Sequence, residues 1–157
     1  MIPGVIVDFL GRATVAMGGT RDSALFPHVH RVSGWTIEPD LQTITCLIGR
    51  QTVNGLIQSL EDNGQFALTV CEMPSHETYQ FKGRFVESRP VGEADIATFR
   101  QCRDRFVERI SAILGYPAEK VRRYIAEPSI AVRFKVKEIF VQTPGTTAGK
   151  RLMPREE

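Results

Sequence analysis

The sequence predicts a mainly β fold, a six-stranded antiparallel barrel with helices packed outside it, and three observations lead to this prediction. Six segments rich in Val, Ile, Thr and Phe alternate apolar with polar residues, as half-buried strands do. Clusters of Gly, Pro, Asn and Asp separate these segments, and one short helical pattern and one helical hairpin interrupt them. Closure into a barrel would remove the edges that an open sheet exposes. The 157 residues suffice for one such domain, over 1–157.

The N-terminal part of the chain predicts a helix and a first hairpin. Residues 3–10 carry Val, Ile, Phe and Leu on one side, and Gly11 follows as a stop signal. A strand over 13–17 is expected to be closed into a hairpin by the Gly-rich residues 18–22. Its partner strand covers 25–37 and has a proline near its beginning, which suits a strand entry or an edge.

The middle of the chain predicts a strand, a short helix and a second hairpin. The strand at 41–48 is rich in β-branched residues and leads through a polar turn into a helix at 53–62, whose apolar residues recur at three- and four-residue spacing. An Asn-Gly pair then stops the helix. Two more strands follow at 66–70 and 78–88, separated by a proline-containing turn.

The strand at 78–88 has an unusual polar face. Gln80, Lys82 and Arg84 alternate with apolar residues and therefore point to the same side of the sheet. Three such side chains cannot all be sealed in a core without partners. We expect this face to meet solvent, a subunit interface or an anionic ligand.

The C-terminal third predicts a helical insertion and one last strand. Residues 93–114 form the longest helical pattern, with one apolar stripe and a charged opposite side, and a shorter helix follows at 118–125. We therefore expect a helical insertion over about 93–125. The strand at 130–141 alternates again, and the tail at about 143–157 has no periodicity, which predicts an irregular segment.

Composition and charge exclude several classes of function. The net charge of +2 offers no general footprint for nucleic acid, and no apolar run is long enough to cross a membrane. The chain has no secretory signal pattern, so we expect a cytoplasmic protein. Its three cysteines are widely spaced and lack a CxxC pair, which argues against disulfides and against a metal site.

A candidate anion site lies between the strand at 41–48 and the helix that follows. Arg50, Gln51 and Thr52 provide a cation, an amide and a hydroxyl beside the unpaired N–H groups of the helix's first turn. Such an arrangement suits a phosphate group. The alternative is that Thr52 or Asn54 is only a helix cap and that Arg50 is a solvated turn residue.

Three stretches resemble a known family. They are Thr20-Arg21-Asp22 before the proline-bearing strand, the run from Leu60 to Leu68, and above all Thr78-Tyr79-Gln80-Phe81-Lys82-Gly83-Arg84. Together with the order of elements over roughly 10–142, they are similar to the pyridoxamine 5'-phosphate oxidase-like flavin-binding split barrels. The resemblance implies a split-barrel homodimer with FMN in two equivalent grooves at the subunit interface.

The resemblance also implies a set of cofactor-binding residues. The FMN phosphate would lie at the candidate anion site, although the family's usual Ser-Arg-Lys run is absent. A glutamine on the fifth strand and a lysine near it would contact the cofactor, and the second strand would flank its ring system. The residues implied are His30, Arg31, Val32, Ser33, Arg50, Gln51, Thr52, Asn54, Gln80 and Lys82.

The sequence leaves alternatives open for the identity of the ligand. A deazaflavin or a haem could occupy the same groove, and His28 and His30, on the same face of one strand, would be the candidate haem residues. More simply, the two histidines line the flavin groove or the interface.

Two functions follow from the flavin interpretation. The first is an FMN-dependent oxidoreductase that acts on a small organic substrate or couples a flavin to a nicotinamide, with the redox chemistry supplied by the flavin. The second is a flavin-binding module for storage or sensing without turnover, which fold alone cannot distinguish from an enzyme. The segment from Thr143 to Glu157 lacks the arginine-and-histidine ending of pyridoxamine 5'-phosphate oxidase itself, so we do not expect that enzyme.

Overall fold

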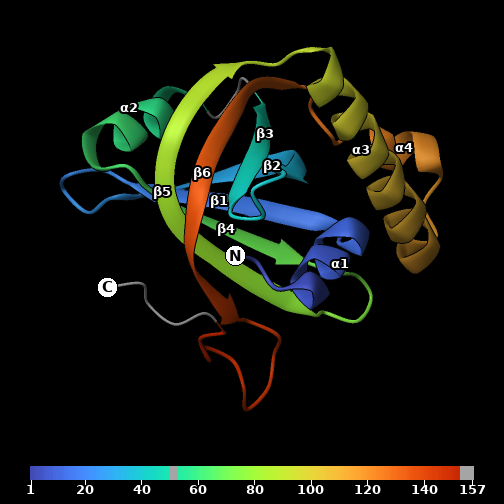
Figure 1. The fold of residues 1–157 in the computed structure, drawn as a ribbon. Helices are drawn as coiled ribbons and strands as arrows, with labels where there is room; N and C mark the ends of the chain where they lie inside the picture. The colour runs from blue at the N-terminus through green and yellow to red at the C-terminus, as the bar shows by residue number, and fades with distance from the viewer. Residues whose placement is uncertain (50–52, 153–157) are drawn as a thin grey trace.

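The computed structural model describes residues 1–49 and 53–152 and confirms the six-stranded antiparallel barrel (Figure 1). The strands close in the order β1-β2-β3-β6-β5-β4, so the last strand in the sequence lies between β3 and β5. The elements are α1 (Gly4–Arg12), β1 (Val15–Arg21), β2 (Pro27–Ile37), β3 (Thr43–Gly49), α2 (Val53–Asn63), β4 (Gln65–Cys71), β5 (Thr78–Pro90), α3 (Glu93–Leu114), α4 (Ala118–Arg122) and β6 (Pro128–Val141).

The barrel interior holds the main hydrophobic core. Along β4 every second residue is buried, as expected when alternate side chains face the interior and the outside, whereas the first six residues of β3 are all buried. Helix α1 adds its buried residues Ile6, Phe9 and Leu10 to this core. The indole Nε1–H of Trp35 on β2 donates a 3.0 Å hydrogen bond to the carbonyl of Leu10, which ties the end of α1 to the barrel.

Helices α3 and α4 form a second layer outside β2, on the right of Figure 1. Phe99 and Val107 of α3 and Val121 of α4 belong to a separate buried cluster that also contains Leu47 of β3. The backbone of Gly34 on β2 lies so close to α3 that an added Cβ would be 3.3 Å from the Cα of Phe99. The apolar stripe predicted on the long helix therefore packs against the barrel wall.

The first hairpin differs from the sequence prediction in where it turns. Residues 18–22 were expected to form the turn, but β1 continues through Arg21 and the turn lies over 22–26. The reason is packing. Gly18 faces the interior, where a Cβ would lie 2.8 Å from the Cζ of Phe66. The glycine therefore makes room for an aromatic ring rather than for a turn.

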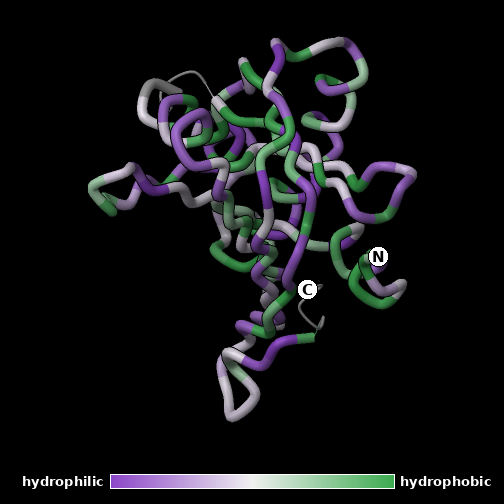
Figure 2. The backbone as a smooth tube through the Cα atoms, turned by 60° about the vertical axis from the view of Figure 1, so that its left-hand side comes forward, coloured by the Kyte–Doolittle hydropathy of each residue, from purple (hydrophilic) through white to green (hydrophobic). Residues whose placement is uncertain are grey.

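The segment after β6 turns back along that strand. It leaves the barrel as a loop, visible at the bottom of Figures 1 and 2, and returns so that Arg151 pairs with Phe140. Three backbone hydrogen bonds of 2.7 to 2.9 Å join the returning residues 149–152 to the end of β6. We call residues 142–152 the C-terminal tail.

No helix among residues 1–49 and 53–152 combines the length and the apolar composition that a membrane-spanning segment needs.

Candidate functional site: a cationic groove on the barrel

An open groove of about 670 Å³ runs over the outer surface of four strands. We call it the cationic groove because four of its lining residues are Lys or Arg and only one is acidic. The lining residues are Gly19, Thr20, Arg21, Gln65, Phe66, Ala67, Lys82, Gly83, Arg84, Lys137 and Glu138.

The register of the strands explains how the groove is built. Lys82 and Arg84 occupy alternate positions on β5, so both side chains point outward. Lys82 is paired with Ala67 of β4, which is in turn paired with Gly19 of β1. Two small residues therefore form the floor beside the lysine, and a flat ligand can approach the backbone there. The Lys and Arg side chains of the groove surround these two small residues.

A β-bulge brings β6 into the groove. Lys82 is paired with Glu138, but the next residue, Gly83, is paired with Val136, so Lys137 is an extra residue on β6. Because a bulge interrupts the alternation of side chains, Lys137 and Glu138 both line the groove although they are consecutive. At Gly83 the two strands approach so closely that an added Cβ would lie 2.1 Å from the carbonyl oxygen of Lys135.

The cations of the groove are held in different ways. The Arg84 guanidinium donates a 2.9 Å hydrogen bond to the carbonyl of Asn63, at the end of α2. The Lys82 ammonium lies 4.8 Å from the centroid of the Phe140 ring, within the range of a cation–π contact. The carboxylate of Glu138 is paired with Arg151 of the C-terminal tail at 2.5 Å. The positive charges of the groove thus exceed the negative ones, which suits a phosphate or another multiply charged anion.

Two of the predicted cofactor residues lie on this side of the barrel. Lys82 lines the groove, and Gln80 lies two residues earlier on the same outward face of β5. The side-chain amide of Gln80 donates a 3.2 Å hydrogen bond to the hydroxyl of Thr69, its cross-strand partner on β4. The structure joins this pair to Arg21, Arg84 and Lys137, which the sequence prediction of the site did not include.

The four predicted residues of β2 do not line the groove. His30 is buried, with its Nε2 3.5 Å from the hydroxyl oxygen of Thr20, and Val32 belongs to the barrel core. Arg31 and Ser33 face the helical layer instead. The Arg31 guanidinium lies 4.8 Å from the centroid of the Phe106 ring on α3, where desolvation lowers its pKa.

Ser33 is held on the same side of the barrel. Its hydroxyl donates a 3.2 Å hydrogen bond to the carbonyl of Ala126, which precedes β6. Ser33 is therefore buried beside the connection that follows α4, whereas Arg31, next to α3, remains exposed.

The predicted phosphate loop falls largely outside the described residues. Arg50, Gln51 and Thr52 are not described, and Asn54 is placed only as part of the first turn of α2. Next to that turn lies His28 of β2, whose Nδ1 would be 3.3 Å from a Cβ added at Gly55. The Nε2 of His28 is 3.9 Å from the Asp22 carboxylate. The start of α2 thus lies beside a polar part of β2, apart from the helical layer.

The groove residues that the sequence prediction missed differ in how clearly the sequence indicates them. The alternation with Lys82 already placed Arg84 on the polar face, so this signal was available. Arg21 was assigned to a turn because two glycines precede it. Lys137 could not be found, because its place depends on a bulge that no local pattern reveals.

Comparisons with known proteins establish the fold. No protein-family model matches the sequence, and no curated protein sequence matches it. Solved structures do match. HupZ of group A Streptococcus is 18% identical, with a TM-score of 0.56, and the match covers 95% of this chain and 100% of HupZ.

Two further matches bear names that concern cofactors. A candidate pyridoxamine 5'-phosphate oxidase from Lactobacillus delbrueckii is 14% identical, with a TM-score of 0.53 and coverage of 89% of this chain and 93% of that protein. An FMN-binding protein from Syntrophomonas wolfei is also 14% identical, with a TM-score of 0.50 and coverage of 83% and 78%. The chain therefore has the split-barrel fold of pyridoxamine 5'-phosphate oxidase-like proteins, as the resemblance implied.

Proposed function

We propose that this split barrel binds FMN and acts as an FMN-dependent oxidoreductase on a small organic substrate. The observation that carries the proposal is the cationic groove. It lies beside Gln80 on the outward face of β5, in a fold that an FMN-binding protein and a candidate pyridoxamine 5'-phosphate oxidase also have. Fold alone does not determine activity, so the chemistry of the groove has to support it.

The residues of the groove fit a phosphate monoester that also carries a planar ring system. A phosphate monoester is close to doubly negative at neutral pH, and guanidinium and ammonium groups form the strongest hydrogen bonds to it. Arg21, Lys82 and Arg84 provide such groups, while Gly19 and Ala67 keep the floor low enough for a planar ring. When bound, the flavin supplies the electron transfer, so the chain's own residues need only to bind and orient it.

The polar pair next to the groove suits the orientation of a ring system. The hydrogen bond from Gln80 to Thr69 fixes the amide, whose carbonyl oxygen can then accept a hydrogen bond from a ring N–H. An amide that hydrogen-bonds to the ring system is the kind of group that tunes a flavin's electronics.

We further propose that the protein is a homodimer whose two copies cover each other's grooves. Met17 on β1 and Val29 on β2 are 39% and 65% exposed and point outward, on the same barrel surface as the groove. Met17 is paired with Thr69, and Gly19 with Val29, so this apolar surface is continuous with the groove floor. A second copy seated there would exclude water from the ring system and complete the site.

The first experiment is the visible spectrum of the purified protein, with titrations of FMN and riboflavin. Riboflavin lacks the phosphate, so we expect it to bind much more weakly than FMN. Adding NADH or NADPH without air then tests turnover. A flavin that NADH or NADPH bleaches supports an oxidoreductase, whereas a flavin that stays oxidised indicates a binding module without activity. A protein that does not bind FMN contradicts the proposal.

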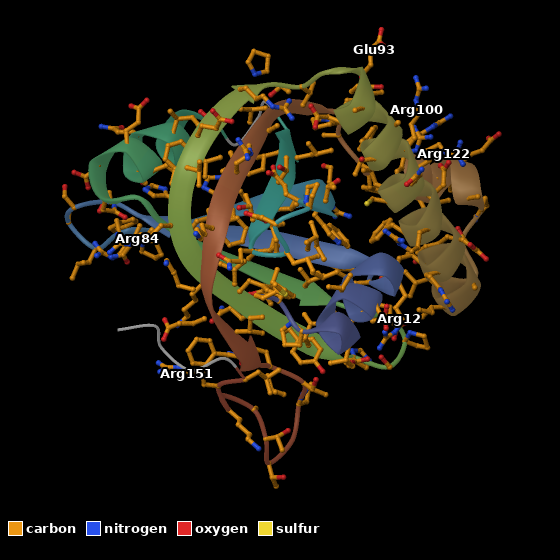
Figure 3. The ribbon with its side chains drawn as sticks, in the orientation of Figure 1. Arg12, Arg84, Glu93, Arg100, Arg122 and Arg151 are labelled. Atoms are coloured by element: carbon orange, nitrogen blue, oxygen red, sulfur yellow. The ribbon has the colours of Figure 1, made fainter. Side chains whose placement is uncertain are left out.

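Two variants locate the site. We expect Lys82→Gln to weaken FMN by about tenfold or more, because a hydrogen bond to a charged group contributes about 1.5–3 kcal/mol. Arg100→Gln is the matched control, since Arg100 is an exposed cation on α3, at the upper right of Figure 3 and far from Arg84. Equal losses in both variants would mean that only overall charge matters.

A further inference from the structure

The only carboxylate that lines the described part of the cationic groove stands directly opposite a lysine. Glu138 of β6 and Lys82 of β5 are cross-strand partners. Opposite charges at such positions normally attract and form an ion pair. The register alone therefore predicts a Lys82–Glu138 pair, which would remove one cation from any ligand.

The C-terminal tail prevents that pair. The Nη2 of Arg151 lies 2.5 Å from the Oε1 of Glu138, and the Glu138 side chain is only 21% exposed. Among residues 1–49 and 53–152, no carboxylate lies within 4 Å of the Lys82 ammonium, which is placed over the Phe140 ring instead. The Arg151 guanidinium lies over the same ring, with its Cζ 5.4 Å from the centroid. In Figure 3, Arg151 and Arg84 are on the same side of the barrel.

The backbone fixes the position of Arg151. Strand β3 ends its pairing with β6 where Thr43 meets Lys135, and one further backbone hydrogen bond joins Val136 to Gln42, so the end of β6 from Ile139 onward lies beyond β3. The tail occupies this edge. The N–H of Leu152 donates to the carbonyl of Ile139 at 2.8 Å, and the N–H of Val141 donates to the carbonyl of Lys150 at 2.9 Å. Two backbone hydrogen bonds therefore flank Arg151 and place its side chain next to Glu138.

We propose that Arg151 is a positioning residue that sets the affinity of the cationic groove for a phosphate-bearing ligand. It does so by neutralising Glu138, which keeps Lys82 available. Without Arg151, Glu138 turns to Lys82 and pairs with it, so that the groove loses one cation available to the phosphate. The proposal depends on the proposed function only for the identity of the ligand as FMN, because any phosphate ester or pyrophosphate would respond in the same way.

Four variants test this inference, each titrated with FMN, with riboflavin and with inorganic pyrophosphate at low salt. We expect Arg151→Gln to bind FMN and pyrophosphate about tenfold more weakly, because the charge balance of the groove that holds the phosphate changes by one unit. Riboflavin binding should not change. Arg151→Lys should stay within about threefold of the wild type, since a lysine can also pair with Glu138.

The double variant separates electrostatics from a structural role of the tail. Glu138→Gln alone should bind FMN as tightly as the wild type or more tightly, and Arg151→Gln combined with Glu138→Gln should recover to within about threefold of the wild type. If the double variant stays as weak as Arg151→Gln, Arg151 acts by holding the tail in place and the inference is wrong. Unchanged affinity in Arg151→Gln also overturns it.

The two probes keep this test apart from the test of function. A wild-type protein that binds pyrophosphate but not FMN contradicts the flavin proposal, while the effect of Arg151→Gln on pyrophosphate still decides the inference. A protein that binds FMN tightly but is indifferent to Arg151 keeps the function and loses the inference. A protein that binds neither probe overturns both.

Discussion

The close approach of β5 and β6 at Gly83 allows one substitution to be predicted in detail. In Gly83→Ala the new Cβ would lie 2.1 Å from the carbonyl oxygen of Lys135, 2.8 Å from its carbonyl carbon and 3.0 Å from Cδ2 of Phe134. Two of these atoms belong to the backbone of the partner strand, so no rotamer change can relieve the contact. The strands have to separate by about 1 Å before the contact becomes tolerable.

The cost follows from what that separation breaks. Moving the strands apart at the bulge weakens about two ladder hydrogen bonds, each with a net contribution of about 1 kcal/mol. Overpacking in a well-packed site adds about 1–3 kcal/mol of strain. We therefore expect Gly83→Ala to lower the free energy of unfolding by about 3 kcal/mol or more. For a domain of this size, that corresponds to a fall in Tm of about 6–12 °C.

Urea and thermal unfolding, each followed by circular dichroism, measure this effect, with Gly19→Ala as the matched control. Gly19 lies in the same groove, but its Cβ would be 3.8 Å from the carbonyl oxygen of Ala67, an ordinary contact. We expect the control to stay within about 0.5 kcal/mol of the wild type. If the Tm of Gly83→Ala lies within about 2 °C of the wild-type Tm, the strands at the bulge accommodate the added methyl group and this reasoning is refuted.

Three further predictions concern residues away from the groove. The hydroxyl of Thr43 and two backbone N–H groups lower the pKa of Asp40 to about 2, so its contribution to stability is present above about pH 4 and disappears as the pH falls through 2. The urea midpoint of Asp40→Ala should therefore depend less on pH in this range than the midpoint of the wild type. An equal pH dependence of the two midpoints would contradict this prediction. A thiol reagent should label half-buried Cys71 in the native protein, whereas Cys46, whose pKa is raised by complete burial, should react only after unfolding. Trp35→Phe leaves a carbonyl of α1 without its donor and should cost about 1–3 kcal/mol in urea unfolding, while an unchanged midpoint would mean that water replaces the indole.

Local alternation was sufficient to predict the strands and one face of the site. On β5, Phe81 is completely buried while Lys82 is exposed, as the period of two requires. The same rule placed Gln80 and Lys82 together on the outside of the barrel. Where a property depends only on the side of the sheet to which a residue points, the sequence is enough.

The remaining parts of the site depend on pairing between distant segments. Lys137 lines the groove only because β6 has one residue more than β5 at the bulge. Arg31 contacts Phe106 because α3 packs on β2, a contact that the pattern of neither element reveals. Arg151 reaches Glu138 because β3, with seven residues, is shorter than the fourteen-residue β6 and leaves an edge for the tail. Register, packing partners and strand lengths are tertiary properties, so no local pattern shows them.

The place of β6 between β3 and β5 also governs how the chain can fold. Residues 1–127 supply β1 to β5 as an open sheet in the order β3-β2-β1-β4-β5, with β3 and β5 as its two edges. Only the last strand can pair with both edges and complete the closure. Because such long-range pairing is slow, we expect folding in milliseconds to seconds rather than microseconds. Until β6 is in place, both edges are available to other chains, so partly synthesised or truncated forms should be the species that aggregate.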